Sequence, residues 1–158
     1  MKEVTIYTDG ACSGNGGPNS RGGFGVVVVD DDGQIIKVYH KHCENTTNNR
    51  EELKAILWAL WNYGNKTNPP TIYSDSAYCV NSLNTWIWGW HKNGWTKSDG
   101  RTPENIDLMS AYVELVDKGY CGNLQKVKGH AGNVYNEMAD KLATGKTTIK
   151  IEEYLGLF

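Results

Sequence analysis

The sequence predicts an α/β fold in which helices flank a five-stranded mixed sheet. Short runs rich in β-branched and aromatic residues alternate with longer segments whose apolar residues recur at helical spacing. Three strand patterns come first, followed by a helix, a strand, two helices, a strand and a helix. This order predicts an antiparallel meander joined to parallel strands by helical crossovers. A chain of 158 residues fits one domain, which we expect over 1–158.

The first predicted strand, residues 4–9, ends at Gly10. Its side chains alternate, with Val4, Ile6 and Thr8 on one face and Thr5, Tyr7 and Asp9 on the other. Asp9 is therefore expected at a strand end, before a glycine-rich loop where backbone can approach a ligand closely. The alternative interpretation is a strand that ends in an Asx turn.

Two further strands, residues 22–29 and 34–42, complete the predicted meander. They are joined by a turn in which Asp32-Gly33 is a strong hairpin signal. The three aspartates at 30–32 resemble the start of a calcium loop, but the later ligands and the closing glutamate are missing. We therefore predict a turn there and no calcium site.

The first long helix opens within residues 46–53 and stops near Gly64. Asn48 and Glu51 have the spacing of a capping box. The apolar stripe of this helix consists of Leu53, Ile56, Leu57 and Leu60. At about 100° per residue, Glu51 lies nearly opposite the stripe, which predicts a solvent-facing position. Glu52 lies at the edge of the stripe, and we expect it along the boundary between helix and sheet.

The second half of the chain opens with another short strand that ends in an aspartate, Asp75. The remaining predicted elements are a helix over 77–84, a helix that starts at Pro103, a strand over 124–127 and a helix after the loop 129–132. The apolar stripe of the last helix consists of Tyr135, Met138, Ala139, Leu142 and Ala143. The C-terminal tail, about 146–158, is amphipathic and could dock as a short helix.

Charge is distributed unevenly along the chain. The formal net charge is −2, yet residues 86–101 carry a local +2 and residues 120–133 another +2. This distribution predicts a basic face beside an acidic centre, which suits a nucleic-acid partner. The four cysteines are widely spaced, so we expect reduced thiols in a cytoplasmic protein. No signal peptide is visible, and no run of about 18 apolar residues predicts a membrane span.

Acidic residues gather at one predicted edge of the sheet. If the strands that end in Asp9 and Asp75 are parallel neighbours, their ends lie side by side, and Glu52 lies on the helix that connects them. Converging carboxylates repel one another strongly unless a cation is present. Hard divalent ions such as Mg²⁺ prefer oxygen ligands, so the pattern favours a metal site. The alternative is that these acids are separate surface groups.

Four groups of motifs follow one another in order, over nearly the whole chain to about residue 145. They are Tyr7-Thr8-Asp9-Gly10 with Gly14-Asn15, Thr46-Thr47-Asn48-Asn49-Arg50-Glu51-Glu52-Leu53, Ser74-Asp75-Ser76, and Val127-Lys128-Gly129-His130-Ala131-Gly132 followed by Asn136-Glu137-Met138-Ala139-Asp140. With these motifs the sequence resembles type 1 ribonuclease H in its bacterial single-domain form. Each motif alone is weak, whereas together they are highly specific.

The resemblance implies a ribonuclease H-like fold and endonucleolytic hydrolysis of the RNA strand in an RNA–DNA hybrid. It implies two Mg²⁺ ions, with Mn²⁺ as a substitute, and products with 5′-phosphate and 3′-hydroxyl ends. The implied metal ligands are Asp9, Glu52, Asp75 and Asp140. The assignment of Asp140 as a metal ligand rests on the resemblance alone, because this residue lies off the apolar stripe of its helix. His130 matches a mobile histidine of the family, thought to help proton transfer or product departure.

The resemblance also implies how a monomeric enzyme would hold the hybrid. The implied substrate-binding residues are Asn15, Thr47, Asn48, Asn49, Trp88, Lys92, Trp95, Lys97, Arg101 and Asn105. Asn15, Asn48 and Asn49 match residues that contact backbones and 2′-hydroxyls across the minor groove. Thr47 matches part of a pocket for a DNA-strand phosphate. Residues 86–101 resemble the basic protrusion of the family.

Three positions leave substrate affinity open. Ala77 stands where bacterial relatives often have a glutamine, and Asn93 and Thr96 make the protrusion less basic than in many relatives. The tryptophans have packing as an alternative to nucleic-acid contact, and we favour packing for Trp86 and Trp90.

Two other functions remain open at this point. The first is a different nuclease or transferase of the same fold, such as an integrase or resolvase core, against which the Thr-Thr-Asn-Asn-Arg and Gly-His-Ala-Gly motifs argue. The second is a non-catalytic module that binds hybrid or double-stranded RNA. A pure binder has no need to concentrate four acids beside phosphate, which disfavours this reading.

Overall fold

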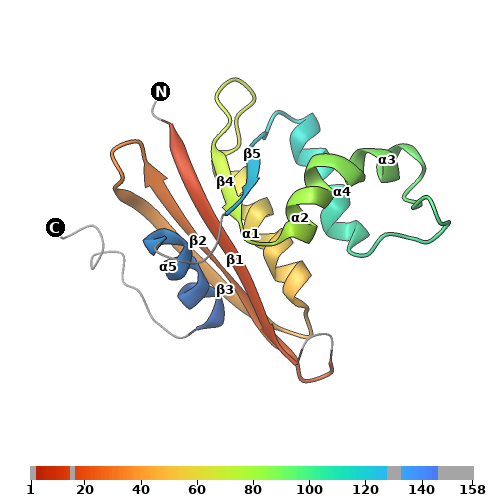
Figure 1. The fold of residues 1–158 in the computed structure, drawn as a ribbon, viewed down its shortest axis with the longest axis horizontal. Coiled ribbons are helices and arrows are strands. Elements are labelled where there is room, and N and C mark those ends of the chain that lie inside the picture. The colour runs from red at the N-terminus through yellow and green to blue at the C-terminus, as the bar shows by residue number, and fades with distance from the viewer. Residues whose placement is uncertain (1–2, 15–16, 128–132, 146–158) are drawn as a thin grey trace.

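The computed structural model describes residues 3–14, 17–127 and 133–145. Its five-stranded sheet has the order β3-β2-β1-β4-β5 (Figure 1). The strands are β1 (Val4–Ser13), β2 (Arg21–Asp30), β3 (Ile35–Glu44), β4 (Thr71–Ser74) and β5 (Asn123–Lys126). β1 and β3 each pair antiparallel with β2, whereas β4 pairs parallel with β1 and with β5. The predicted meander joined to parallel strands is confirmed.

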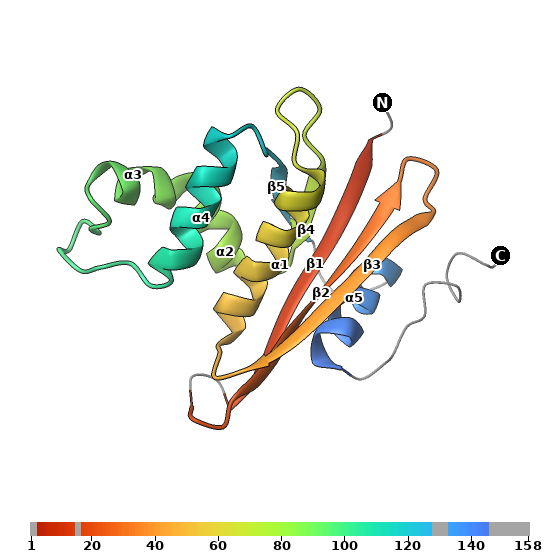
Figure 2. The same ribbon diagram turned by 180° about the vertical axis from the view of Figure 1, so that it is seen from behind.

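Helices cover both faces of the sheet. α1 (Asn48–Tyr63), α2 (Ala77–Asn81) and α4 (Ile106–Asp117) lie on one face, and α5 (Val134–Thr144) lies on the other (Figures 1 and 2). Within the described part of the chain, no helix is long and apolar enough to cross a membrane.

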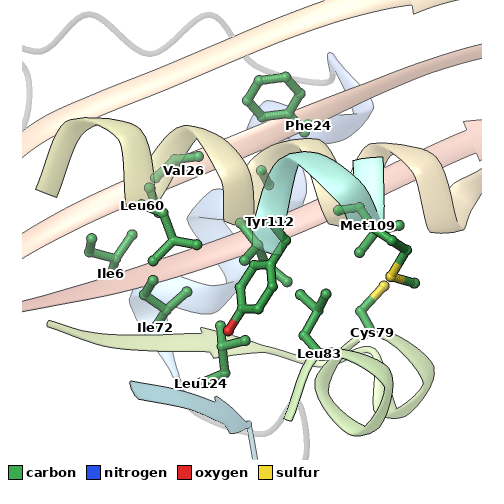
Figure 3. Close-up of a cluster of buried hydrophobic side chains, with 14 of the residues drawn as sticks. Ile6, Phe24, Val26, Leu60, Ile72, Cys79, Leu83, Met109, Tyr112 and Leu124 are labelled. Carbon is green, nitrogen blue, oxygen red and sulfur yellow. The ribbon is translucent and has the colours of Figure 1, made fainter. Parts of the chain in front are cut away.

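The core lies on both sides of β2, whose residues 22–29 are all buried. Alternate valines face opposite layers, as the two-residue period of a strand requires. Val26 belongs to the cluster beneath α1, with Ile6 and Leu60 (Figure 3). Val27 belongs to the cluster beneath α5, with Leu142. A strand that is buried on both faces has a continuous run of apolar residues. The four consecutive buried valines, Val26–Val29, are such a run.

The first strand extends further than the sequence predicts. β1 continues past Gly10 to Ser13, and its last four residues pair with Phe24 to Arg21 of β2. The prediction that the strand ends at Gly10 was wrong, because a partner strand supplies hydrogen bonds that override the local glycine signal. Asp9 therefore lies within β1 and pairs with Gly25.

Two helix boundaries also differ from the prediction. α2 continues without interruption through the π-helical turn η1 (Ser82–Trp86) into α3 (Ile87–Lys92), well beyond residue 84. The buried side chains of Leu83 and Ile87 hold this extension against the core. α4 begins at Ile106 and not at Pro103, because Asn105 has left-handed backbone with φ 61° and ψ 36°. The predicted loop 129–132 and the tail 146–158 lie outside the described residues.

Candidate active site

The parallel pairing of β1 with β4 sets the position of the first two acids. Tyr7 pairs with Tyr73, so the residues that follow, Asp9 and Asp75, come to the same level of the sheet. Beside them, the Thr8 Oγ1 hydroxyl donates to the Tyr73 carbonyl oxygen at 2.8 Å, which ties the two strands together. Asp75 directly follows β4, as predicted.

The third acid reaches the site because α1 packs directly on Gly10. A Cβ atom at this glycine would lie 2.6 Å from the Glu51 carbonyl carbon and 2.9 Å from Glu52 Cα, so any side chain would displace the helix. Glu52 thereby faces β1 and β4. The Ser74 hydroxyl donates to Glu52 Oε2 at 3.2 Å and fixes the orientation of this carboxyl.

Asp9, Glu52 and Asp75 form the carboxyl cluster, in which one oxygen of each side chain lies within 4.8 Å of the others. Asp9 and Glu52 are only 5% and 6% exposed, whereas Asp75 is half-buried. The predicted convergence of these three side chains is confirmed. The alternative of separate surface groups does not fit this burial.

The electrostatics of the carboxyl cluster favour a cation. Burial raises the pKa of Asp9 to about 7, and the neighbouring charge of Asp75 adds to the shift. Burial also raises the pKa of Glu52 well above its ordinary value of 4.5, followed in effect by the charge of Asp9. Asp9 and Glu52 share a hydrogen bond that lowers the pKa of Asp9 and raises that of Glu52. Near neutral pH the pair therefore retains a proton that a divalent cation could replace.

Asp140 lies on α5 at the rim of this cluster. α5 can approach the sheet closely here because Gly25 of β2, the partner of Asp9, has no side chain: a Cβ there would lie 2.6 Å from Leu142 Cβ. Asp140 is exposed, as its place off the apolar stripe predicts, and it is not one of the three acids within 4.8 Å. Its hydrogen bond and charge nevertheless help to raise the pKa of Asp9, so it belongs to the same electrostatic site.

The solvent-facing position that helical periodicity predicts for Glu51 is wrong. Its side chain is 1% exposed, not solvent-facing, and its Oε2 atom accepts from the Thr46 hydroxyl at 2.6 Å. Lys54 Nζ lies 2.7 Å from the same oxygen. The capping box is also absent: Thr47 is the N-cap residue, and its Oγ1 accepts from the Arg50 amide at 3.2 Å. The segment before α1 folds over Glu51, and a helical wheel cannot show such coverage.

Several of the predicted substrate-binding residues gather at the start of α1. Asn48 is exposed, and Thr47 and Asn49 are half-buried in the first turn. Arg50 links this turn to α4, because its Nη1 donates to Asn105 Oδ1 at 3.3 Å and its two Nη atoms hold Asp107 at 3.0 and 2.8 Å. The structure thus brings Asn105 near the α1 residues. Asn15 and His130 lie outside the described residues.

The other predicted contacts lie on the protrusion, residues 86–101, which consists mainly of α3 and the loop after it and projects away from the sheet (Figure 1). Trp88, Lys92 and Arg101 are exposed. Trp95 and Lys97 are half-buried: Trp95 packs against the core, and Lys97 Nζ lies 5.7 Å from the centre of the Trp90 ring. The Trp86 and Trp90 ring centres are 6.1 Å apart, which fits the favoured packing, although Trp86 remains 46% exposed.

Sequence reasoning missed the residues that orient the site. Ser74 and Arg50 stand inside motifs, yet their partners, Glu52 and Asn105, are distant in the chain. Asn136 is 2% exposed, and its Oδ1 has no hydrogen-bond partner among the described residues, one helical turn before Asp140. A buried asparagine among apolar helix positions was the available signal, because such groups are normally hydrogen-bonded.

The sheet order, helices on both faces and carboxyls between β1 and β4 define an α/β enzyme of the ribonuclease H fold. A family model described as RNase H matches residues 1–148. A Ribonuclease H of Caldanaerobacter subterraneus subsp. tengcongensis is 45% identical over 151 residues, which cover 95% of this chain and 94% of that protein. A Ribonuclease H of Caldicellulosiruptor saccharolyticus is 44% identical, with 90% and 94% covered. The chain belongs to the RNase H family and is a nuclease.

Solved structures agree with this assignment. LC9-RNase H1, described as a type 1 RNase H with the type 2 active-site motif, has a TM-score of 0.75 and 31% identity, covering 94% of this chain and 74% of that one. The PFV RNase H domain, at 24% identity and a TM-score of 0.75, shares the fold, with 92% and 94% covered. Membership in the family implies use of a divalent metal, for which the carboxyl cluster supplies oxygen ligands.

Proposed function

We propose that the chain is an endoribonuclease that hydrolyses the RNA strand of RNA–DNA hybrids with two Mg²⁺ ions, leaving 5′-phosphate and 3′-hydroxyl ends. The observation that carries this proposal is the carboxyl cluster, whose three oxygens converge within 4.8 Å. Asp9, Glu52, Asp75 and Asp140 would hold the ions, and His130 would assist proton transfer or product departure. Family membership supports the substrate class.

The donor set fits the proposed metal. Carboxylate oxygens suit Mg²⁺, and Mn²⁺ accepts the same ligands. The raised pKa of Asp9, caused first by burial and then by Asp75, marks a site where negative charge is costly without a cation. Removing the four carboxylate charges changes the formal net charge from −2 to +2, so metal loading should also help to admit a polyanion.

When bound, Mg²⁺ would activate a water and stabilise the charge on the leaving 3′-oxygen. The protein's own part is to position the acids. Ser74 orients the Glu52 carboxyl by donating to Oε2 at 3.2 Å, and Thr8 fixes β1 against β4 by donating to Tyr73 O at 2.8 Å. The start of α1 would contact sugar and phosphate groups, and the protrusion would hold the DNA strand.

The same proposal includes a monomer that acts in the cytoplasm. All four cysteines are free, at positions 12, 43, 79 and 121, which suits a reducing compartment. Size-exclusion chromatography with light scattering would test the monomeric state.

The decisive experiment presents labelled RNA–DNA hybrid, duplex RNA and duplex DNA to the purified chain, with and without Mg²⁺, and maps the product ends. We expect cleavage of the hybrid alone, only with Mg²⁺, and loss of cleavage in Asp75→Asn with hybrid binding retained. Asp31→Asn is the matched control, because Asp30, Asp31 and Asp32 also place three carboxyls within 4.8 Å but are not buried. Near-normal turnover of Asp75→Asn at saturating Mg²⁺ would refute the metal assignment.

A further inference from the structure

The last turn of α5 is bonded to a side chain of β3. The Nε2 atom of His42 lies 3.0 Å from the Leu142 carbonyl oxygen, and the nitrogen is the donor because a carbonyl oxygen can only accept. Leu142 belongs to the last turn of α5, where carbonyl groups have no partner further along the helix. The Gly145 amide also donates to this oxygen, at 3.4 Å. His42 therefore makes the shorter of these two bonds.

The His42 ring and the end of α5 meet above Gly23 of β2. His42 pairs with Gly23, and a Cβ atom at this glycine would collide with the His42 ring. The same Cβ atom would lie 2.7 Å from the Ala143 carbonyl oxygen. At the end of the helix, a Cβ atom at Gly145 would lie 3.5 Å from His42 Nε2. The missing side chain at Gly23 thus gives the His42 ring access to the last turn of α5.

The last turn of α5 in turn supports Asp140. This residue lies one helical turn before Thr144, the final residue of α5, and the Thr144 hydroxyl donates to the Asp140 carbonyl oxygen at 3.0 Å. The Asp140 side chain is exposed and shares a hydrogen bond with Asp9. Helix ends fray, and packing holds an exposed side chain less firmly than a buried one. The place of Asp140 beside Asp9 therefore depends on the order of this turn.

We propose that His42 is a positioning residue of the nuclease site: its bond to the Leu142 carbonyl oxygen holds the last turn of α5, and with it Asp140, against the carboxyl cluster. His42 acts from a distance, because β2 separates β3 from β1. Since Asp140 would hold a metal ion only in the proposed function, the role of His42 rests on that function. Because His42 is exposed, its hydrogen bond should affect metal binding more than overall stability.

Two substitutions separate the hydrogen bond from the ring. His42→Phe keeps a ring above Gly23 and cannot donate, whereas His42→Gln loses the ring and offers an amide N–H in place of Nε2–H. Calorimetric titration of the full chain with Mn²⁺, without nucleic acid, measures metal affinity, and hydrogen exchange measures the protection of the last turn of α5. We expect His42→Phe to bind Mn²⁺ about tenfold more weakly, the lower end of what loss of an orienting partner costs. Exchange at the last turn should be faster, and His42→Gln should restore both properties.

Cleavage of the hybrid at varied Mg²⁺ adds a second measurement. His42→Phe should need more Mg²⁺ for half-maximal cleavage and reach nearly the wild-type rate at saturation, because excess metal compensates for a poorly held ligand. A lower rate at saturating Mg²⁺ with an unchanged half-maximal concentration would contradict the positioning role.

Tyr135→Phe is the matched control. It removes a hydrogen bond at the start of the same helix, where the Tyr135 hydroxyl donates to the Gly33 carbonyl oxygen at 2.6 Å. We expect unchanged Mn²⁺ affinity, and denaturant unfolding compares its stability with that of His42→Phe. Wild-type Mn²⁺ affinity in His42→Phe, or an equal loss of affinity in Tyr135→Phe, would overturn the proposal.

Asp140→Asn distinguishes a failure of this proposal from a failure of the proposed function. If Asp140→Asn weakens Mn²⁺ binding and His42→Phe does not, only the role of His42 is refuted. If Asp140→Asn binds Mn²⁺ as the wild type does, Asp140 is not a ligand, and the role of His42 is refuted together with that assignment.

Discussion

Glu51 and Glu52 are neighbours in the chain and have different surroundings. Glu51 is the centre of a structural cluster, in which Thr46 and Lys54 both bond its Oε2 atom. Glu52 faces the sheet, where it joins Asp9 and Asp75 within 4.8 Å. Since both are buried, the burial of the carboxyl alone does not distinguish the two roles; the nature of the partners does.

We therefore expect Glu51→Ala to lower the free energy of unfolding by about 1–3 kcal/mol, because it leaves the Thr46 hydroxyl and the Lys54 ammonium without their acceptor. Glu52→Gln should remove most cleavage and change the stability little, since it removes one of several repelling carboxyls. Denaturant unfolding and hybrid cleavage, measured on both variants, check the pair. Equal losses of activity in the two variants would contradict the assignment.

At this scale the sequence predicted well that Asp9, Glu52 and Asp75 converge, and predicted poorly which residues contact them. The convergence of Asp9 and Asp75 was predictable, because chain order makes β1 and β4 parallel neighbours, although Asp9 lies within β1 and not at its end. Glu52 was predictable from the helical wheel. The burial of Glu51 was not, because Thr46 and Cys43 cover it from the loop and from β3, and such coverage depends on tertiary packing. Asp140 needed the family resemblance, since an exposed aspartate on a helix carries no signal of its own.

At the scale of elements, the contact between α1 and β1 at Gly10 decides whether the acids meet. Gly10→Ala should destabilise the fold by about 1–3 kcal/mol and reduce cleavage strongly, because a Cβ atom would lie 2.6 Å from the Glu51 carbonyl carbon and push α1 outward. Gly89→Ala on α3 is the matched control, since a Cβ there would have nothing within 4 Å. It should be neutral or stabilise the helix by up to about 1 kcal/mol. Equal behaviour of the two alanines in melting and cleavage would contradict the packing argument.

The type and order of elements were predictable, whereas several boundaries were not. Gly10 marks a strand end locally, but pairing with β2 carries β1 on to Ser13. The helix that starts at Ala77 continues to Lys92, because burial of Ile87 supports residues that lack a clear apolar stripe. Pro103 is a good helix start by propensity, yet the left-handed backbone of Asn105 delays α4 to Ile106.

The protrusion offers a test that is independent of the acids. Changing Lys92, Lys97 and Arg101 together to alanine should weaken hybrid binding and leave single-turnover cleavage at saturating enzyme nearly unchanged. If all three contact phosphate, the slope of log affinity against log salt should fall by up to about 3 units, at roughly 0.9 per contact for duplex DNA. Lys37→Ala on β3, another exposed lysine, is the control. An unchanged slope would show that the protrusion does not hold the substrate, and a collapsed single-turnover rate would show that it positions the scissile phosphate.

At the scale of the whole molecule, the carboxyl cluster should make the stability of the metal-free protein depend on pH. The folded-state pKa of Asp9, raised to about 7 by burial and by Asp75, exceeds the unfolded value of about 3.9. Between these values the folded state binds more protons than the unfolded state, so stability falls as pH rises from about 4 to about 7. Glu52 acts in the same direction. The hydrogen bond from Arg50 lowers the pKa of Asp107, so this residue changes the stability only at pH values below this window, where stability falls as pH falls.

Melting temperatures across pH 4 to 8, with EDTA and with Mg²⁺, measure this effect. We expect the decline in EDTA to be flattened in Asp9→Asn, and the stabilisation by Mg²⁺ to be greatest above about pH 7, where the cluster has lost its proton. A wild-type decline that persists unchanged in Asp9→Asn would assign the pH dependence to other groups.

The position of β3 at the outer edge of the sheet has a consequence for how copies of the chain meet. Its outer backbone groups pair with no other strand of the described residues and could accept a strand from another molecule, which is a common route to aggregation. The strand is exposed at Lys37, Lys41 and Glu44, and its register with β2 shifts between Val28 and Val29. A second copy approaching this edge would bring its own Lys37 and Lys41 near the same two cations. These lysines therefore oppose intermolecular strand addition, whereas Ile35, the buried residue of β3, packs within the molecule.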